Sequence, residues 1–235
     1  MEEIIQLDKQ LLLMLNGSDS TFIDGAVLTL THAATWIPLY VSLLFVVIKN
    51  NINWRTIVFI VASAGLCVLM AGTVDDTIVK PLVARWRPTH DPQIGALVDV
   101  VNNYRGGNYG FFSAHASNTF SIALFFSLLV RFRPLTIALV CYSLVNCWTR
   151  LYLGVHYPGD ITVGLLWGAV TALTVYSLFR FVNSRWADGR RRRYTSDSYT
   201  STGYDKRTAY VPVVVLILTF VYALVRAYFI MDSIA

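Results

Sequence analysis

The sequence predicts an all-α integral membrane protein, a six-helix bundle that forms a single domain over residues 1–235. Of its 235 residues, 55% are hydrophobic and only 14% are charged, whereas soluble domains carry about 25% charged residues. Barrel-type alternating strands are not evident, and an open sheet cannot span lipid. Apolar runs close to the ~20 residues that a spanning helix needs lie at about 27–48, 57–79, 115–132, 134–154, 160–181 and 211–230.

The chain begins with apolar residues at helical spacing: Ile4, Leu7, Leu11, Met14 and Leu15. Charged residues lie between these positions, which predicts a short amphipathic helix at the membrane interface. A frayed tail is the alternative, because isolated helices of this length are marginal in water. The acidic start, with no continuous apolar run after it, predicts that there is no cleavable signal peptide.

Two of the six candidate spans are interrupted by polar residues, so the sequence does not fix where these spans begin and end. These residues are Thr29, Thr31 and His32 in the first span, and Ser117, Asn118 and Thr119 in the third. The three cysteines fall inside candidate spans and lack metal-ligand spacing. Neither a disulfide framework nor a cysteine metal site is therefore expected.

Basic residues gather in three of the connecting loops and predict the orientation of the bundle. These loops hold twelve of the nineteen Lys and Arg against three acids. By the positive-inside rule they face the cytoplasm, so both termini and the other two loops face outward. The basic residues are Lys49, Arg55, Arg131, Arg133, Arg180, Arg185, Arg190 to Arg193, Lys206 and Arg207.

The last of these loops, at 190–209, is predicted to be a basic, flexible cytoplasmic segment that meets anionic headgroups. A nucleic-acid partner is not expected. The membrane topology accounts for the net charge of +5, and no nucleic-acid-binding signature accompanies it.

The first of three polar clusters lies at the end of the second candidate span. Lys80 follows Asp76 by four residues, so an i,i+4 ion pair is one interpretation. Arg87 follows two helical turns later, and the two cations point the same way if a short helix begins at Pro81. Arg offers phosphate oxygens a planar fork and Lys a point charge. Arg85 is off that face and is predicted to be a surface residue.

The second cluster, Ser113-Ala114-His115, lies where the third candidate span begins. Ser113 is an ordinary N-cap residue, but a helix start also presents backbone N–H groups and a positive dipole to an anion. Ser113 and the amides that follow it are therefore expected to cradle phosphate oxygens, with His115 beside the bound group. The segment before it, 89–112, is either a lid or an ordinary connection.

The third cluster surrounds the turn between the fourth and fifth candidate spans. Arg150 ends the fourth span, and His156 and Asp160 lie four residues apart across the turn. Asp160 is either only an N-cap residue, with Pro158 and Gly159 in the turn before it, or the acceptor of the His156 Nδ1–H. In the second case the bond fixes the tautomer and leaves Nε2 free as a nucleophile. Ionisable groups near membrane segments are costly and usually functional.

The three clusters together resemble the three-part signature of the type 2 phosphatidic acid phosphatase (PAP2) family, a superfamily that includes vanadium haloperoxidases and glucose-6-phosphatase. The matching patterns are Lys80-x6-Arg87-Pro88, Ser113-Ala114-His115 and Arg150-x5-His156-x3-Asp160. The motifs cover residues 80–160, and the six-helix layout extends the resemblance across the chain. The sequence departs from the usual motifs at Phe112 for Pro, Ala114 for Gly and Thr149 for Ser.

The resemblance implies two-step phosphoryl transfer without a metal or other cofactor. In this mechanism His156 attacks phosphorus, Asp160 stabilises its imidazolium, and His115 protonates the leaving group. Water then hydrolyses the phosphohistidine. The implied phosphate-binding residues are Lys80, Arg87, Ser113, Ala114 and Arg150.

The resemblance also implies a lipid phosphate as substrate and the bilayer as surroundings, and leaves the oligomeric state open. Family substrates are undecaprenyl diphosphate, lipid A, phosphatidylglycerophosphate and phosphatidic acid, and the first two are favoured. The expected location is a bacterial inner membrane, with the site on the periplasmic or extracellular side. A vanadium haloperoxidase would share the site, but such relatives are usually larger and soluble. The remaining alternative is a non-catalytic lipid-phosphate binder or transporter, which needs no nucleophilic histidine.

Overall fold

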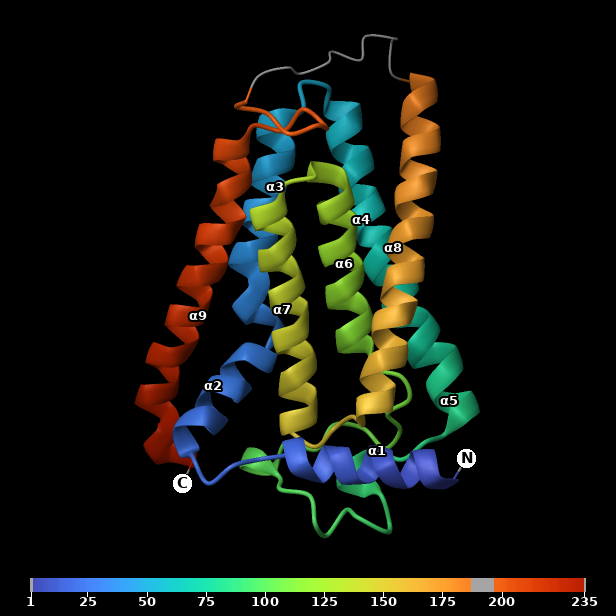
Figure 1. Ribbon diagram of the computed structural model, residues 1–235, viewed down its shortest axis with the longest axis vertical. Coiled ribbons are helices and arrows are strands. Elements are labelled where there is room, and N and C mark those ends of the chain that lie inside the picture. The colour runs from blue at the N-terminus through green and yellow to red at the C-terminus, as the bar shows by residue number, and fades with distance from the viewer. Residues whose placement is uncertain (1, 187–196, 235) are drawn as a thin grey trace.

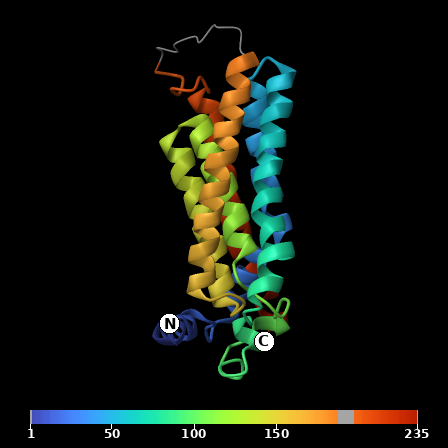
Figure 2. The same cartoon turned by 90° about the vertical axis from the view of Figure 1, so that its right-hand side faces the viewer.

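The protein is all-helical, as the sequence predicts. The computed structural model describes residues 2–186 and 197–234, and no strand occurs among them. The long helices run side by side, and α1 lies across one end of the bundle (Figures 1 and 2). The helices are α1 (Glu2–Leu15), α2 (Thr21–Thr31), α3 (Ile37–Asn50), α4 (Trp54–Val74), α5 (Lys80–Val83), α6 (Ala114–Val130), α7 (Arg133–Tyr152), α8 (Pro158–Trp186) and α9 (Lys206–Ile234).

Four helical segments of the described chain are long and apolar enough to cross a membrane. They are Ala33–Asn50, Trp54–Val83, Pro158–Ser184 and Lys206–Ile234. Two further apolar helices, Thr21–Thr31 and Ala114–Val130, are shorter. Length and hydropathy therefore support a membrane protein with four candidate spans, fewer than the six of the sequence prediction.

The first candidate span, predicted as one helix over 27–48, is two helices. Helix α2 ends at Thr31, and a 3-10 turn separates it from α3. Side chains satisfy the carbonyls that this break frees, as buried helix ends require. Thr35 Oγ1 donates to the Thr29 carbonyl at 2.6 Å, and Trp36 Nε1 donates to the Leu30 carbonyl at 2.9 Å.

The second span continues beyond its predicted end at residue 79. A π-helical turn, Asp75–Val79, joins α4 to α5. Such bulges are rare and often lie at functional sites. Helix α5 stops at Ala84, which takes the left-handed conformation with φ 46°, so the helical phase of Lys80 does not extend to Arg87.

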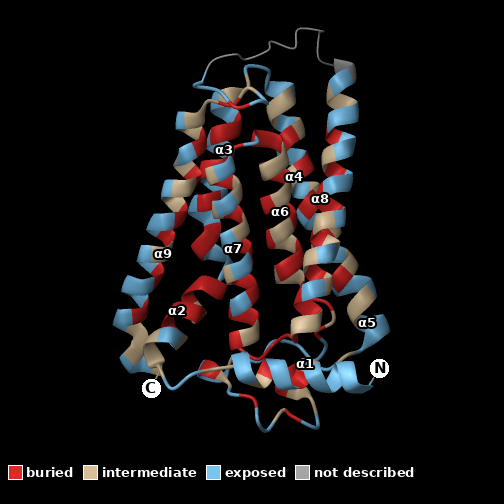
Figure 3. Cartoon of the chain, in the orientation of Figure 1, coloured by how far each residue is buried: buried red, intermediate tan, exposed pale blue. Residues whose placement is uncertain are grey.

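Helix α6 lies in the middle of the bundle and approaches α8 at two glycines. A Cβ on Gly164 would lie 2.7 Å from the Ser113 carbonyl oxygen, and one on Gly168 would lie 2.6 Å from that of Ser117. Small residues four apart allow such close approach of membrane helices. Buried residues line the inner faces of the helices (Figure 3). This contact fixes the start of α6 beside the start of α8.

The amphipathic helix predicted at the N-terminus is confirmed as α1. Leu12 is completely buried, whereas Ile4, Leu7 and Met14 are 73%, 54% and 80% exposed. The exposed apolar side chains form an outward surface, and the helix spans the end of the bundle below α7 and α8 (Figure 1). Its location at a membrane interface stays a prediction.

The described end of the segment predicted as a flexible basic loop, 190–209, forms a hydrogen-bonded turn. Residues 190–196 lie outside the described part of the chain. After them, Thr200 N donates to the Tyr204 carbonyl at 2.8 Å, and Thr202 Oγ1 donates to the Val130 carbonyl at the end of α6 at 2.8 Å. These bonds fix a turn before α9, which begins at Lys206.

We expect Gly168→Ala to lower the free energy of unfolding by about 1–3 kcal/mol, because the added methyl meets a backbone carbonyl that cannot move aside. Gly65→Ala is the matched control, because a Cβ at Gly65 meets nothing within 4 Å and Ala favours helix. Thermal unfolding in detergent, followed by circular dichroism, measures both. Equal melting temperatures would contradict the close contact of α6 with α8.

Candidate active site

The three polar clusters converge at the end of the bundle that carries α1. His115, in the first turn of α6, lies within electrostatic reach of Lys80, Arg87, Arg150 and His156. The backbone N–H of Ser113 donates to the carbonyl of Asp160 at 3.1 Å, which ties the second cluster to the third. The tertiary structure thus brings all three motifs of the sequence into one site.

His156 lies in the turn between α7 and α8 and is 2% exposed. Its Nε2 lies 3.2 Å from Nη1 of Arg87. Because a guanidinium only donates, Nε2 is the acceptor and the ring proton is on Nδ1. Burial, together with Arg87 and Arg150, holds the pKa of His156 well below its usual value. The imidazole is therefore neutral at pH 7, with its Nε2 lone pair available.

His156 and Asp160 face each other, but they are too far apart for the hydrogen bond that the sequence predicts. Nδ1 lies 3.7 Å from Asp160 Oδ2 and has no hydrogen-bond partner in the described part of the chain. The two groups face each other at a separation that a small shift would close, and catalytic hydrogen bonds are often long before substrate binds. The role of Asp160 as orienter of the imidazole stays a prediction.

Asp160 is fully buried and makes two close contacts of its own. Its Oδ2 accepts from the backbone N–H of Tyr157 at 2.9 Å, which is one half of a capping box at the start of α8. Its Oδ1 accepts from Arg85 Nη1 at 2.7 Å. Asp160 therefore caps the helix from its third position and not as the N-cap residue, and it also forms an ion pair with Arg85.

The prediction that Arg85 is a surface residue is wrong. Its side chain is only 24% exposed and forms ion pairs with Asp160 and with Asp8 of α1. The prediction assumed that one helix runs from Lys80 through Arg87, but this helix ends at Ala84. The sequence carries a signal for this role only in the position of Arg85 inside the first motif.

Lys80 makes the ion pair that the sequence allowed, and one more. Its Nζ lies 2.5 Å from Asp76 Oδ1 and 2.8 Å from Asp75 Oδ2. Asp75 is fully buried and was not singled out from the sequence. The π-helical turn places both carboxylates next to Lys80 and holds this cation. The charge of Lys80 also acts on both imidazoles.

Arg87 is held by the end of the segment 89–112 and by the turn between α7 and α8. Its Nε donates to the Tyr109 carbonyl at 3.1 Å, and its Nη1 to the Val155 carbonyl at 3.3 Å. Gly110 passes close by, since a Cβ there would lie 3.0 Å from Arg87 Cγ. The end of this segment therefore forms a wall of the site, and its role as a lid stays a prediction.

Arg150, at the end of α7, is 2% exposed. Its Nη1 donates to Thr31 Oγ1 and, at 3.1 Å, to the hydroxyl of Tyr104. Its Nε has no hydrogen-bond partner within the described residues. Sequence reasoning missed Thr31 and Tyr104, because α2 and the segment 89–112 reach Arg150 only through the tertiary fold. A buried guanidinium with an unused donor is suited to an anion.

Ser113 caps α6, as one of the two interpretations of the sequence proposed. It is fully buried, and its Oγ accepts from the backbone N–H of Ala116 at 3.4 Å. Ala114 is the first residue of the helix, and the cationic groups lie around this helix start, where backbone donors favour anions. The phosphate-binding role of Ser113 and Ala114 stays a prediction.

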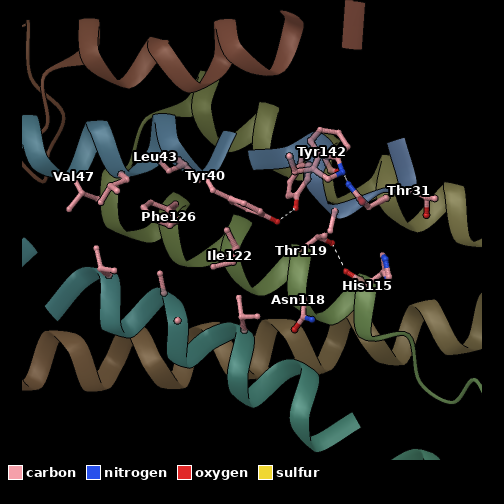
Figure 4. Close-up of a pocket in the computed structure, with 18 residues that line it drawn as sticks. Thr31, Tyr40, Leu43, Val47, His115, Asn118, Thr119, Ile122, Phe126 and Tyr142 are labelled. Carbon is pink, nitrogen blue, oxygen red and sulfur yellow. Dashed lines mark hydrogen bonds between the residues drawn. The ribbon is translucent and has the colours of Figure 1, made fainter. Parts of the chain in front are cut away.

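His115 also borders an apolar cavity of about 550 Å³ between α3, α4, α6 and α7. In Figure 4 the polar residues Thr31, Asn118 and Thr119 lie at the His115 end, and apolar side chains continue away from it. Ile122, Phe126, Leu43 and Val47 line the far part, beyond the hydrogen-bonded hydroxyl pair of Tyr40 and Tyr142. His115 thus borders both the cationic site and an apolar cavity between the helices.

Comparison with known proteins identifies the family. A family model described as the PAP2 superfamily matches residues 54–184, more than half of the chain and all three clusters. The chain belongs to the PAP2 superfamily. This PAP2 protein is a phosphatase, as its curated relatives with that activity also indicate. No solved structure matches it.

The relatives share most of their length with this PAP2 chain. Lipid A 4'-phosphatase of Bacteroides thetaiotaomicron is 37% identical over 185 residues, which are 78% of this chain and 82% of that protein. Lipid A 4'-phosphatase of Porphyromonas gingivalis is 34% identical over 192 residues, 79% of this chain and 78% of its own. Decaprenylphosphoryl-5-phosphoribose phosphatase of Mycobacterium tuberculosis is 33% identical over 147 residues, 63% and 73% of the two chains.

We expect Arg87→Lys to lower kcat/KM about 10- to 100-fold, because lysine keeps the charge but not the fork that holds two carbonyls and faces Nε2. Arg133→Lys, an exposed arginine at the opposite end of the bundle, is the matched control and should leave kcat/KM unchanged. Phosphate release in detergent measures both. Full activity of Arg87→Lys would contradict the contacts described for Arg87.

Proposed function

We propose that the protein is a lipid A phosphatase that removes the 4'-phosphate at the outer face of a bacterial inner membrane. The observation that supports a lipid phosphate as substrate is the apolar cavity next to a buried cationic site. A phosphate group would satisfy the unused Nε donor of Arg150, while a hydrocarbon chain would fill the space beyond His115. The two relatives with the broadest coverage are named for this activity.

The proposed reaction has two steps. In the first, His156 Nε2 attacks phosphorus, the bond from phosphorus to the sugar oxygen breaks, and His115 delivers its proton to that oxygen. In the second, water attacks the phosphohistidine, His115 accepts a proton, and the P–N bond breaks to release inorganic phosphate. Asp160 stabilises the imidazolium that forms on His156.

Fixed positive charge supports this proposed reaction without a metal ion. The equatorial oxygens carry charge throughout the transfer, and Lys80, Arg87 and Arg150 surround the position that they would occupy. Preorganised donors of this kind are worth about 2.7–4 kcal/mol each when removed from an active site. Ser113 and the amide of Ala114 add neutral donors at the start of α6.

We also propose that the chain crosses the membrane six times, with α2 and α3 together counted as one crossing. The loops with Lys49, Arg55, Arg131 and Arg133 lie at the end of the bundle opposite the site (Figure 1). By the positive-inside rule that end is cytoplasmic. The site, α1 and both termini then face the periplasm or cell exterior.

A polyprenyl phosphate is the second candidate substrate, because the Mycobacterium relative is named for a decaprenyl-linked phosphate. The apolar cavity favours neither, since acyl and prenyl chains are both flexible hydrocarbons. The two candidates differ in the headgroup, which the outward-facing end of the site would contact.

The test is phosphate release by purified protein in detergent containing EDTA. The panel is lipid A, undecaprenyl diphosphate, phosphatidylglycerophosphate and phosphatidic acid. We expect fastest release from lipid A, specifically from its 4' position, and none from the His156→Ala variant. Release that is faster from undecaprenyl diphosphate would replace the substrate assignment, and binding without release from any lipid would favour a binder or transporter.

A cavity-filling variant tests the proposed chain-binding role. We expect Gly65→Leu to raise KM for long-chain lipids about tenfold, because the new side chain displaces roughly two methylene groups from the cavity. Gly65 lines the cavity and has open space around it, so the fold tolerates the change. Hydrolysis of water-soluble phenyl phosphate is the control and should be unaffected. An unchanged KM for lipids would place the hydrocarbon chains elsewhere.

A further inference from the structure

A chain of charged groups connects the N-terminal helix to the buried carboxylate of the site. Asp8 of α1 lies 2.6 Å from Arg85 Nη2, and Arg85 Nη1 lies 2.7 Å from Asp160 Oδ1. The side chain of Asp8 is 12% exposed, that of Arg85 24% and that of Asp160 0%. The chain therefore connects two partly exposed groups to the buried residue that faces His156.

Several contacts fix this chain in one arrangement. Asp8 Oδ1 also accepts from the backbone N–H of Gly159 at 2.8 Å, and a Cβ on Gly159 would lie only 2.9 Å from Asp8 Oδ2. The guanidinium of Arg85 lies 4.1 Å from the centre of the Tyr157 ring. Asp8 therefore holds both the arginine and the backbone next to the catalytic turn.

We propose that Asp8 and Arg85 are positioning residues that hold Asp160 opposite Nδ1 of His156. The inference rests on the proposed role of His156 as nucleophile. With Oδ1 held by Arg85 and Oδ2 by the Tyr157 N–H, the carboxylate cannot rotate away from the imidazole. Without the Asp8 carboxylate, only Asp160 would hold the Arg85 guanidinium. Arg85 would then no longer hold the Asp160 carboxylate in one orientation. Helix α1 is thus part of the catalytic apparatus through its inner, polar face.

The neighbouring residue Lys9 offers a matched control on the same helix. Its Nζ lies 2.8 Å from Asp91 Oδ2 and 2.8 Å from Gln93 Oε1. This contact also docks α1 onto the bundle, but neither Lys9 nor its two partners form a hydrogen bond with Asp160. A variant at Lys9 therefore weakens docking without removing the chain from Asp8 to Asp160.

The kinetic test compares Asp8→Asn, Arg85→Gln, their double variant and Lys9→Met. We expect the first two to lower kcat about 10- to 100-fold, as loss of a charged hydrogen bond predicts, with KM changed less than twofold. The double variant should be no slower than Arg85→Gln alone, because the two residues act through one chain. Arg85→Lys should restore part of the rate, and Lys9→Met should keep kcat within twofold.

A second measurement does not depend on turnover. Nitrogen-15 NMR of histidine-labelled protein reports which ring nitrogen of His156 carries the proton, with His156→Ala to assign the signal. We expect the Nδ1–H tautomer in the unmodified protein and in Lys9→Met, and a mixture of tautomers in Asp8→Asn and Arg85→Gln. If the proposed activity itself fails, the unmodified protein releases no phosphate, while this tautomer difference still tests the positioning role.

Two results would overturn the proposal. The first is unchanged kcat and an unchanged His156 tautomer in both Asp8→Asn and Arg85→Gln. The second is an equal loss of kcat in Lys9→Met, which would assign the effect to docking of α1 in general. Melting temperatures of all variants separate either result from loss of the fold, and Asp8→Asn keeps the size of the side chain.

Discussion

The site depends on one buried carboxylate. Asp160 has no exposed surface, and removing a carboxylate from water costs several kcal/mol unless partners offset the cost. Arg85 and the Tyr157 N–H supply that offset. Arg85 in turn needs Asp8, so the N-terminal helix is tied to the centre of the bundle. The ends of α1, α7 and α8 are consequently held in the arrangement that brings His156 between Asp160 and the arginines.

Positive charge lies on the other side of His156. Arg87 and Arg150 lie close enough to lower the pKa of this imidazole, and Arg150 keeps an unused buried donor. Two guanidiniums near each other in a desolvated place repel, and an anion between them offsets that repulsion. A neutral imidazole next to a cationic pocket is the combination that nucleophilic attack on a phosphate group requires. The proposed chemistry thus relies on charges that burial places around His156.

Helix packing determines where these groups meet. Gly164 and Gly168 let α8 approach the backbone of α6, which brings Ser113 next to Asp160. Thr31, the last residue of α2 before the break, contacts Arg150. On the other side, looser packing of α3 and α4 against α6 leaves the apolar cavity next to His115. Close packing in one place and open packing in another together produce a site with a polar end and an apolar end.

The sequence by itself determined the all-helical membrane class, the amphipathic start of the chain and the family, because hydropathy, helical spacing and motif residues are local properties. It also supplied every motif residue that the structure gathers at one end of the bundle. Tertiary structure alone decided the break within 27–48, the ordered turn before α9, and the inward path of Arg85 after the left-handed Ala84. Asp8, Asp75 and Tyr104 carry no local signal either. Their contacts join residues distant in sequence, and such contacts depend on how helices pack.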